Sequence, residues 1–168
     1  MKRISRTFLL TALFVSLLIM SVAYHSGCAT TRVGDVAPAL EFESEPTDAL
    51  RALRGKYVLL CFWASTNAPS REAVGRYTSW VERQHNMDVG LLSYNFDKSE
   101  PLFREIVKRD GLNQQLQFHP SESSMRRLMR NYNLREGQYG TLLIAPDGRI
   151  VAHNPSTADL PALIATES

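Results

Sequence analysis

Short continuous runs of apolar residues alternate along the chain with apolar residues at helical spacing, which predicts strands alternating with helices. Residues 57–63 form a continuous apolar run that is too short for a free-standing helix and rich in strand formers. We therefore expect a buried central strand there. A second strand is predicted over 89–94. Residues 141–145 and 149–153 flank a Pro-Asp-Gly turn and are predicted to form a hairpin.

Helices are predicted where a residue that can cap a helix precedes apolar side chains at helical spacing. The first predicted helix starts at Thr66 or Asn67 and has Pro69 in its first turn, and the second starts at Ser99 and ends at Gly111. The third carries the apolar repeat Met125, Leu128, Met129 and Tyr132. The last starts with a capping box of Ser156 and Asp159. Pro161 makes the first turn of that last helix uncertain. The order of elements indicates an α/β domain with a central mixed β-sheet flanked by helices.

The N-terminus changes how the composition is interpreted. Lys2, Arg3 and Arg6 precede an uncharged run over 8–24, which is the layout of an export signal. Without the first 27 residues, which hold three of the 19 basic residues and no acid, 16 Lys and Arg stand against 17 Asp and Glu, a net charge of −1. Overall charge therefore gives no support for a nucleic-acid partner.

The apolar run is followed by small residues and Cys28, which resembles a bacterial lipobox cut before an acylated cysteine. His25 departs from that pattern, and an uncleaved signal anchor stays open as the alternative. Either way the membrane is an expected partner through the N-terminal lipid or anchor. We predict a signal segment over 1–27, a tether over 28–38 and one domain over 39–168.

Four motifs follow one another in the exported part: 33–38 (VGDVAP), 55–65 (GKYVLLCFWAS), 110–112 (DGL) and 143–150 (LIAPDGRI). They resemble the landmarks of membrane-tethered thioredoxin-fold proteins of the TlpA/ResA type, in particular thioredoxin-like lipoproteins of Bacteroidetes. The resemblance implies a thioredoxin-like fold and a periplasm-facing lipoprotein in a bacterial envelope, with the choice of inner or outer membrane left open. Active relatives are thiol-disulfide oxidoreductases.

The departures from this family concern its redox site. Where active relatives carry a Cys-x-x-Cys pair at a helix start, this chain has Asn67-Ala68-Pro69-Ser70. Disulfide exchange needs a thiolate and a resolving thiol, and an amide and a hydroxyl supply neither. The position that relatives fill with a cis-proline falls on Tyr139. A plain helix start explains the four residues, and anion or carboxylate binding at the helix terminus is the alternative.

Other chemistry-bearing residues give weaker signals. Cys61 is the one thiol expected in the domain, and an apolar strand favours simple burial of its side chain. Trp63 and Trp80 are expected in the core. The sequence suggests no metal site and no cofactor, because His85, His119 and His153 lie on separate segments. Arg126, Arg127, Arg130 and Arg135 form a basic face that is solvated or contacts an acidic partner or lipid headgroups.

Two functional hypotheses follow. The first is a non-catalytic, membrane-tethered thioredoxin-fold module that binds a protein or peptide. The second is a thiol-dependent oxidoreductase, similar to TlpA or AhpC/TSA proteins, that uses the lone Cys61 or a cysteine of a partner. The missing cysteine pair favours the first.

Overall fold

The computed structural model describes residues 31–40, 53–84 and 88–165. Within them the strands are β1 (Tyr57–Trp63), β2 (Val89–Asn95), β3 (Gln117–Phe118), β4 (Thr141–Ile144) and β5 (Ile150–His153). The helices of this part are α3 (Ala68–Glu82), α4 (Glu100–Arg109), α5 (Glu122–Asn131) and α6 (Leu160–Ala165), with a short 3₁₀ helix, η1 (Gln114–Leu116). Each predicted strand and helix is confirmed, with shifts of a few residues at its ends.

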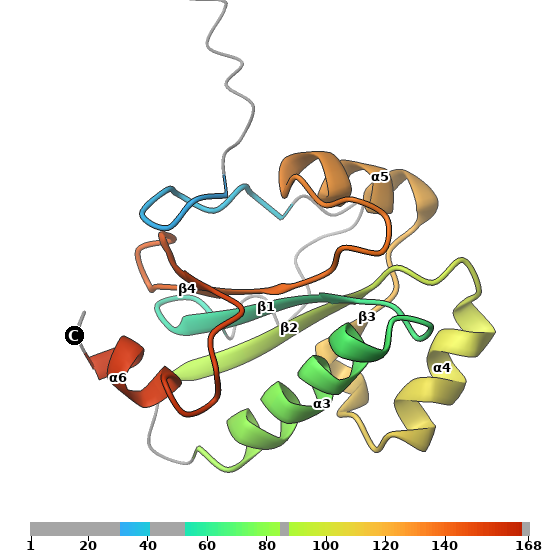
Figure 1. Ribbon diagram of the computed structural model, residues 1–168, viewed down its shortest axis with the longest axis horizontal. Coiled ribbons are helices and arrows are strands. Elements are labelled where there is room, and N and C mark those ends of the chain that lie inside the picture. The colour runs from blue at the N-terminus through green and yellow to red at the C-terminus, as the bar shows by residue number, and fades with distance from the viewer. Residues whose placement is uncertain (1–30, 41–52, 85–87, 166–168) are drawn as a thin grey trace, which may run out of the picture.

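The strands form one mixed sheet in the order β3-β2-β1-β4-β5. The central strand, β1, pairs in parallel with β2 along its whole length and antiparallel with β4 from Val58 to Cys61. Figure 1 shows α5 on one side of the sheet and α3, α4 and α6 on the other. This layering confirms the mixed sheet flanked by helices that the sequence predicts.

Two hydrophobic cores lie on opposite faces of the sheet, because successive side chains of a strand point to opposite sides. Leu59, Cys61 and Trp63 join the core under α3, α4 and α6, and Trp80 of α3 is buried there as predicted. Leu60 and Phe62 join the core under α5. A strand buried on both faces needs apolar residues at every position, which is why 57–63 is one unbroken apolar run.

Side-chain caps fix where the helices begin. Asn67 caps α3 and Ser99 caps α4, as the sequence predicts. Ser121 caps α5, whose first turn lies ahead of the apolar repeat that begins at Met125. The amphipathic repeat marks the packed face of that helix, so it does not locate the polar first turn.

The predicted capping box precedes α6. Ser156 Oγ donates a hydrogen bond to Asp159 Oδ2 at 2.7 Å and accepts one from the Asp159 backbone N–H at 3.2 Å. Pro161 is accommodated in the first turn of α6, where a missing N–H is not needed for the helical ladder.

Strand β3 was not predicted. It has two residues, with Gln117 beside Ser93 and Phe118 beside Tyr94 of β2. A two-residue edge strand carries no periodicity, so only its tertiary pairing defines it.

Residues 34–38, which the sequence analysis assigns to the tether, make contacts with the domain. The backbone N–H groups of Gly34 and Ala37 donate to the carbonyls of Ile150 and Gly148 at 2.8 and 2.9 Å. Tyr132 Oη, at the C-cap of α5, donates to the Pro38 carbonyl at 2.5 Å. The segment therefore lies across the β4–β5 hairpin and reaches α5 (Figure 1).

Several sequence predictions lie outside the described residues, namely the export segment, the acylation site Cys28 and His85. Over the described ranges, no helix is long and apolar enough to span a bilayer.

We expect Gly90→Ala to destabilise the protein by about 1–3 kcal/mol, because the new Cβ would lie 1.9 Å from Leu53 Cδ2 and force it to move. Gly75→Ala in α3 is the matched control. Its Cβ meets no described atom within 4 Å, so helix propensity should add about 1 kcal/mol of stability. Urea unfolding of both variants measures the two changes. Equal midpoints for Gly90→Ala and the unmodified protein would contradict the packing argument.

Candidate functional site

The candidate site lies at the edge of the sheet where β1 and β2 end and β4 begins. Asn67 to Ser70, here called the Asn67–Ser70 turn, follows the end of β1 after three intervening residues and starts α3. Tyr139 and Gly140 lead into β4, and the Gly140 carbonyl accepts a hydrogen bond from Phe62 N–H of β1 at 2.9 Å. The sheet thus brings together the two segments in which the sequence departs from the thioredoxin pattern.

The side chain of Asn67 is used as a helix cap. Its Oδ1 accepts the Ser70 N–H at 3.0 Å, and its Nδ2 donates to the Gly137 carbonyl at 3.1 Å. The amide therefore closes the first turn of α3 and ties it to the loop before β4. An amide can do this because its acceptor oxygen and its donor nitrogen are separate atoms on one short side chain.

Ser70, the last residue of this turn, is buried. Its Oγ donates to the Asn67 carbonyl at 3.0 Å and accepts the Ala64 N–H at 3.3 Å. The hydroxyl thus links the end of β1 to α3 through two main-chain groups. Both hydrogen bonds are made to main-chain groups of the protein itself.

The hydrogen bonds of this turn leave few free N–H donors that could bind an anion at the helix terminus. Pro69 has no N–H, Ser70 N–H donates to Asn67 Oδ1, and Arg71 N–H donates to the Asn67 carbonyl at 3.0 Å. Three of the first four residues of α3 therefore offer no free donor. The plain helix start is the better interpretation of these four residues.

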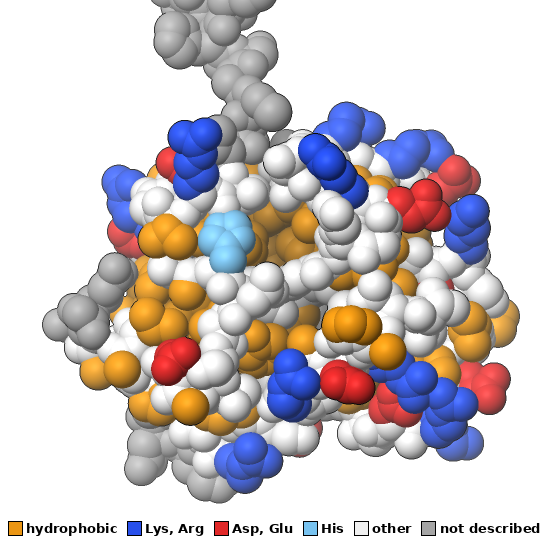
Figure 2. All heavy atoms as spheres, in the orientation of Figure 1, with side chains coloured by type: hydrophobic (Ala, Val, Ile, Leu, Met, Phe, Trp, Pro, Cys, Tyr) orange, Lys and Arg blue, Asp and Glu red, His pale blue; other side chains and the backbone are white. Residues whose placement is uncertain are grey.

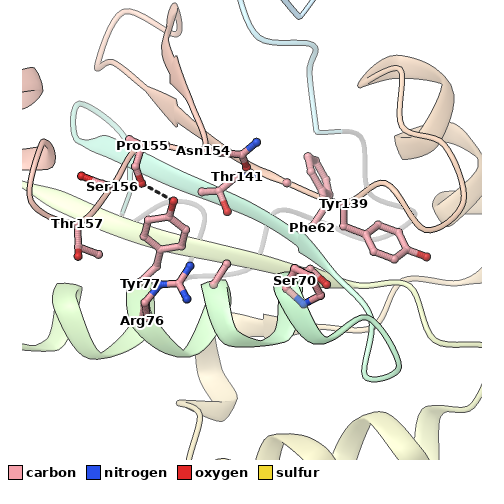
Figure 3. A pocket seen from close by; sticks show the side chains of 13 residues that line it. Phe62, Ser70, Arg76, Tyr77, Tyr139, Thr141, Asn154, Pro155, Ser156 and Thr157 are labelled. Carbon is pink, nitrogen blue, oxygen red and sulfur yellow. Dashed lines mark hydrogen bonds between the residues drawn. The ribbon is translucent and has the colours of Figure 1, made fainter.

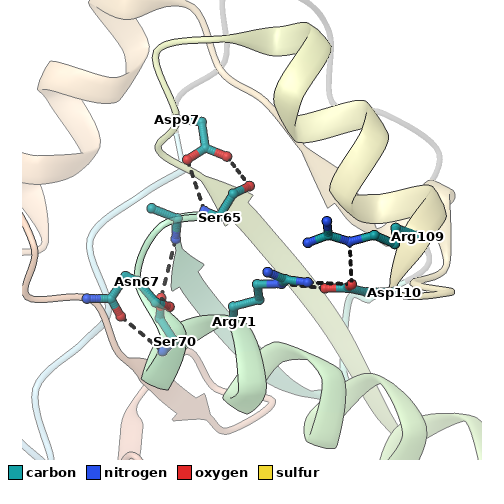
Figure 4. A network of polar contacts seen from close by, with 8 residues as sticks. Ser65, Asn67, Ser70, Arg71, Asp97, Arg109 and Asp110 are labelled. Carbon is teal, nitrogen blue, oxygen red and sulfur yellow. Dashed lines mark hydrogen bonds and ion pairs between the residues drawn. The ribbon is translucent and has the colours of Figure 1, made fainter.

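A buried carboxylate stands beside the turn, and the sequence analysis did not single it out. Asp97, just beyond β2, accepts hydrogen bonds from the backbone N–H of Ser65 at 2.9 Å and from the Ser65 hydroxyl (Figure 4). His119 Nε2 donates to the Asp97 carbonyl at 2.8 Å. The signal that could have found Asp97 is its place directly after a buried strand, because strand ends meet at this edge.

An ion pair fixes α3 against the end of α4. Arg71 Nε and Nη2 contact the two oxygens of Asp110 at 2.6 and 2.7 Å (Figure 4). This bidentate hydrogen bonding holds the pKa of Asp110 below its ordinary value. Asp110 belongs to the Asp-Gly-Leu motif, so the motif has a structural role at this contact.

A groove runs along α3 from the Asn67–Ser70 turn, and we call it the α3 groove. It has a volume of about 460 Å³ and is lined by α3, by residues 139–141 and by residues 154–157. In Figure 3, Ser70 and Tyr139 lie at one end and Thr157 at the other. Figure 2 shows that this face of the molecule is hollowed near its middle, with hydrophobic side chains in the hollow.

Two contacts shape the wall of the groove opposite Tyr139. Tyr77 Oη of α3 donates to the Pro155 carbonyl at 2.6 Å (Figure 3). Asn154, at a φ of +46°, accepts the Thr141 N–H on its Oδ1 at 2.8 Å. A Cβ on Gly140 would lie 2.8 Å from that same Oδ1. Gly140 is therefore required for the loop to approach β4 this closely.

Cys61 lies in β1 under this site, and its side chain is 1% exposed. Thr141 Oγ1 donates to its Sγ at 3.4 Å. Burial raises the pKa of the Cys61 thiol from 9.0 to about 12, against a smaller lowering by the Thr141 hydrogen bond. The thiol therefore stays protonated near neutral pH, and it cannot contact a disulfide of another molecule unless the surrounding structure opens.

The remaining candidate residues are dispersed. His153 is exposed at the end of β5, far along the chain from His119. In the described part of the chain, no three His, Cys, Asp or Glu side chains converge on a possible metal position. On α5, Arg126 pairs with Glu122, and Arg127 Nη2 donates to Ser124 at 3.2 Å. The predicted basic face is thus partly neutralised by its own helix.

The parallel β1–β2 pair, the helix that begins directly after β1 and the antiparallel β4–β5 hairpin define a thioredoxin-like fold. A thioredoxin-like protein from Parabacteroides distasonis is similar at 30% identity, with a TM-score of 0.68, over 81% of this chain and 96% of that one. The chain belongs to the thioredoxin-like family.

Two further structures share the fold at lower identity. The thioredoxin domain of a thiol-disulfide oxidoreductase from Bacteroides vulgatus has 21% identity and a TM-score of 0.64, over 81% of this chain and 97% of that one. A putative protein disulfide isomerase from Bacteroides thetaiotaomicron has 24% identity and a TM-score of 0.57, over 82% and 88%. No protein-family model and no curated protein matches the chain.

We expect Cys61 to resist alkylation in the folded protein, because its thiol is both buried and protonated. Iodoacetamide at pH 8 should label a Cys28→Ser variant at least about 100-fold more slowly than it labels glutathione, since the thiolate fraction falls tenfold per pKa unit. In urea the same thiol should react at the ordinary rate. Rapid labelling of the folded variant would contradict the structure of this site.

Proposed function

We propose that the protein is a non-catalytic thioredoxin-fold module that binds a segment of another protein or a peptide in the α3 groove. The observation that carries this proposal is the hydrogen bonding of Asn67 and Ser70. Both side chains occupy the helix start that relatives use for a cysteine pair, and both are engaged with main-chain groups.

The groove supports binding because its lining combines apolar and polar groups. Ala73 and Pro69 of α3 offer apolar surface, whereas Arg76, Ser156 and Thr157 offer charge and hydrogen bonds. Concave sites with an apolar lining and a few polar groups are the usual form of a ligand site. The contacts of Tyr77 with Pro155 and of Asn154 with Thr141 keep this lining in place before a ligand arrives.

The single-thiol enzyme finds less support. Cys61 would need to reach the surface and lose a proton, and its burial opposes both steps. An enzyme that uses a cysteine of a partner would also need a thiol of this protein with which to exchange. Among the described residues that thiol is Cys61, which is buried.

The binding function is tested with the full chain as bait in detergent-solubilised envelope. We expect a partner that the unmodified protein retains to be lost with Ala73→Arg, which fills the groove. Ser79→Arg is the matched control, because Ser79 lies exposed on α3 and outside the groove lining. A dithiol-coupled insulin assay on the same preparations should show no turnover, and Cys61→Ser should not change that.

Two results would overturn the proposal. One is retention of the same partner by the Ala73→Arg variant at undiminished yield. The other is insulin reduction by the unmodified protein that disappears in Cys61→Ser, which would favour the single-thiol enzyme.

We also propose that the domain is tethered to a bacterial envelope membrane through its N-terminus and faces the periplasm. The uncharged run over 8–24 and the small residues before Cys28 support this. The described chain begins at residue 31, three residues after Cys28, and residues 34–38 already contact the hairpin. A tether this short would hold the domain close to the bilayer.

Metabolic labelling with a radioactive fatty acid tests the tether. We expect label in the unmodified protein and none in Cys28→Ser, because acylation requires the thioether of that cysteine. Equal label in both proteins would refute lipidation at Cys28, and an uncleaved chain in the membrane fraction would then favour the signal anchor.

A further inference from the structure

A second cavity lies beside the Asn67–Ser70 turn, on the other side of Tyr139 from the α3 groove. It has a volume of about 840 Å³, and we call it the Tyr139 cavity. Three segments enclose it: 96–100 after β2, 119–129 leading into and along α5, and the loop from Glu136 to Tyr139. Nothing in the proposed function uses this cavity.

Aromatic and thioether side chains give the cavity an apolar wall. The rings of Phe96 and Tyr139 are stacked, with centroids 5.6 Å apart and an angle of 28° between their planes. Met125 and Met129 of α5 line it and are half-buried. Such a wall accepts an unbranched hydrocarbon stem, and an aromatic face also attracts a cation.

The charges of the lining favour a positive ligand. The acids that line the cavity are Asp97, Glu100, Glu122 and Glu136, the cationic side chains are Lys98 and Arg126, and the imidazole of His119 also lines it. Arg126 is neutralised by Glu122, and Glu100 pairs with Arg104 outside the cavity. Two acids then remain, the buried Asp97 and the exposed Glu136, against one cationic side chain, the exposed Lys98, so the remaining charge is negative.

Two observations place this negative charge near the aromatic wall. Asp97 is 7% exposed, and within the described part of the chain its carboxylate accepts hydrogen bonds from Ser65, one on each oxygen, whereas a carboxylate can accept about four. Burial raises the pKa of Tyr139, and the charges of Glu136 and Asp97 raise it further. The Tyr139 hydroxyl therefore lies in the field of both carboxylates.

We propose that the Tyr139 cavity binds a lysine or arginine side chain of a partner protein, with the methylene stem against Phe96, Met125 and Met129 and the cationic head near Asp97 and Glu136. An anionic group would meet net negative charge. A purely apolar side chain would desolvate Asp97 and Glu136 and leave both without a cation. A side chain with a cationic head on an apolar stem packs its methylene groups against the apolar wall and places its charge near the two carboxylates.

The test uses the full chain in detergent micelles and blocked tripeptides, acetyl-Ala-Xaa-Ala-amide, with Lys, norleucine or Glu at the centre. Nitrogen–proton NMR spectra should show shifts at Phe96, Met125 and Tyr139 with the Lys peptide. We expect norleucine to bind at least about fivefold more weakly and Glu not to bind, because about 1 kcal/mol of charge interaction corresponds to that factor.

Variants with opposite expected signs make the test specific. Glu136→Gln should weaken binding of the Lys peptide about two- to fivefold, and Lys98→Gln should tighten it by a similar factor. Glu105→Gln, an exposed acid on α4 outside the lining, is the control and should change nothing. Ala73→Arg should leave this binding intact, which separates the cavity from the α3 groove.

Three outcomes would overturn the inference. They are equal affinity for the Lys and norleucine peptides, no change with Glu136→Gln, and shifts confined to residues outside the cavity. Free n-butylammonium that binds as tightly as the Lys peptide would also overturn it, since the cavity would then be a small-amine site and not a docking site for a protein side chain.

Discussion

The pairing of β1 with both of its neighbours is the constraint on which the rest of the structure depends. Because β2 runs parallel to β1 and β4 runs antiparallel to it, the ends of β1 and β2 and the start of β4 meet at one edge of the sheet. That register places the Asn67–Ser70 turn, Asp97 and Tyr139 beside one another, although they are far apart in the chain. A one-residue slip of β1 would exchange the two cores, so burial on both faces fixes this edge as firmly as it fixes the sheet.

The chemistry possible at this edge depends on whether its side chains can ionise and act as nucleophiles. A cysteine pair at a helix start gains reactivity because the terminus stabilises a thiolate. The amide of Asn67 cannot become an anion, and it uses the same helix terminus as a hydrogen-bonding cap. The hydroxyl of Ser70 is equally committed, since it joins Ala64 to Asn67. The feature that promotes catalysis in redox relatives thus stabilises the fold here, and the one described thiol, Cys61, lies beneath it in the core.

The sequence predicted what local patterns encode and missed what tertiary contact creates. The unbroken run over 57–63 identified the central strand, because burial on both faces leaves no polar position. Asn67, Ser99 and the Ser156–Asp159 box identified helix starts, because capping depends on neighbouring residues only. Strand β3, the burial of Asp97 and the contact between Asn154 and Gly140 were not predicted. Each of these depends on a partner more than ten residues away, and no local periodicity reports such a partner.

Tyr139 lines both the α3 groove and the Tyr139 cavity, and its position bears on how the proposed binding module would hold a partner. A thiol-disulfide oxidoreductase holds its substrate protein briefly through a mixed disulfide, so it depends less on the area of noncovalent contact. The proposed module has no thiol at the turn, so all of its affinity for a partner would come from noncovalent contact, and each cavity alone offers a modest surface. Because Tyr139 lines both, a single chain segment that crosses it can fill the groove with one part and the cavity with another. The second contact is then intramolecular and adds to the first without a new association cost. The stacking of Tyr139 on Phe96 holds this crossing point in place before a partner arrives.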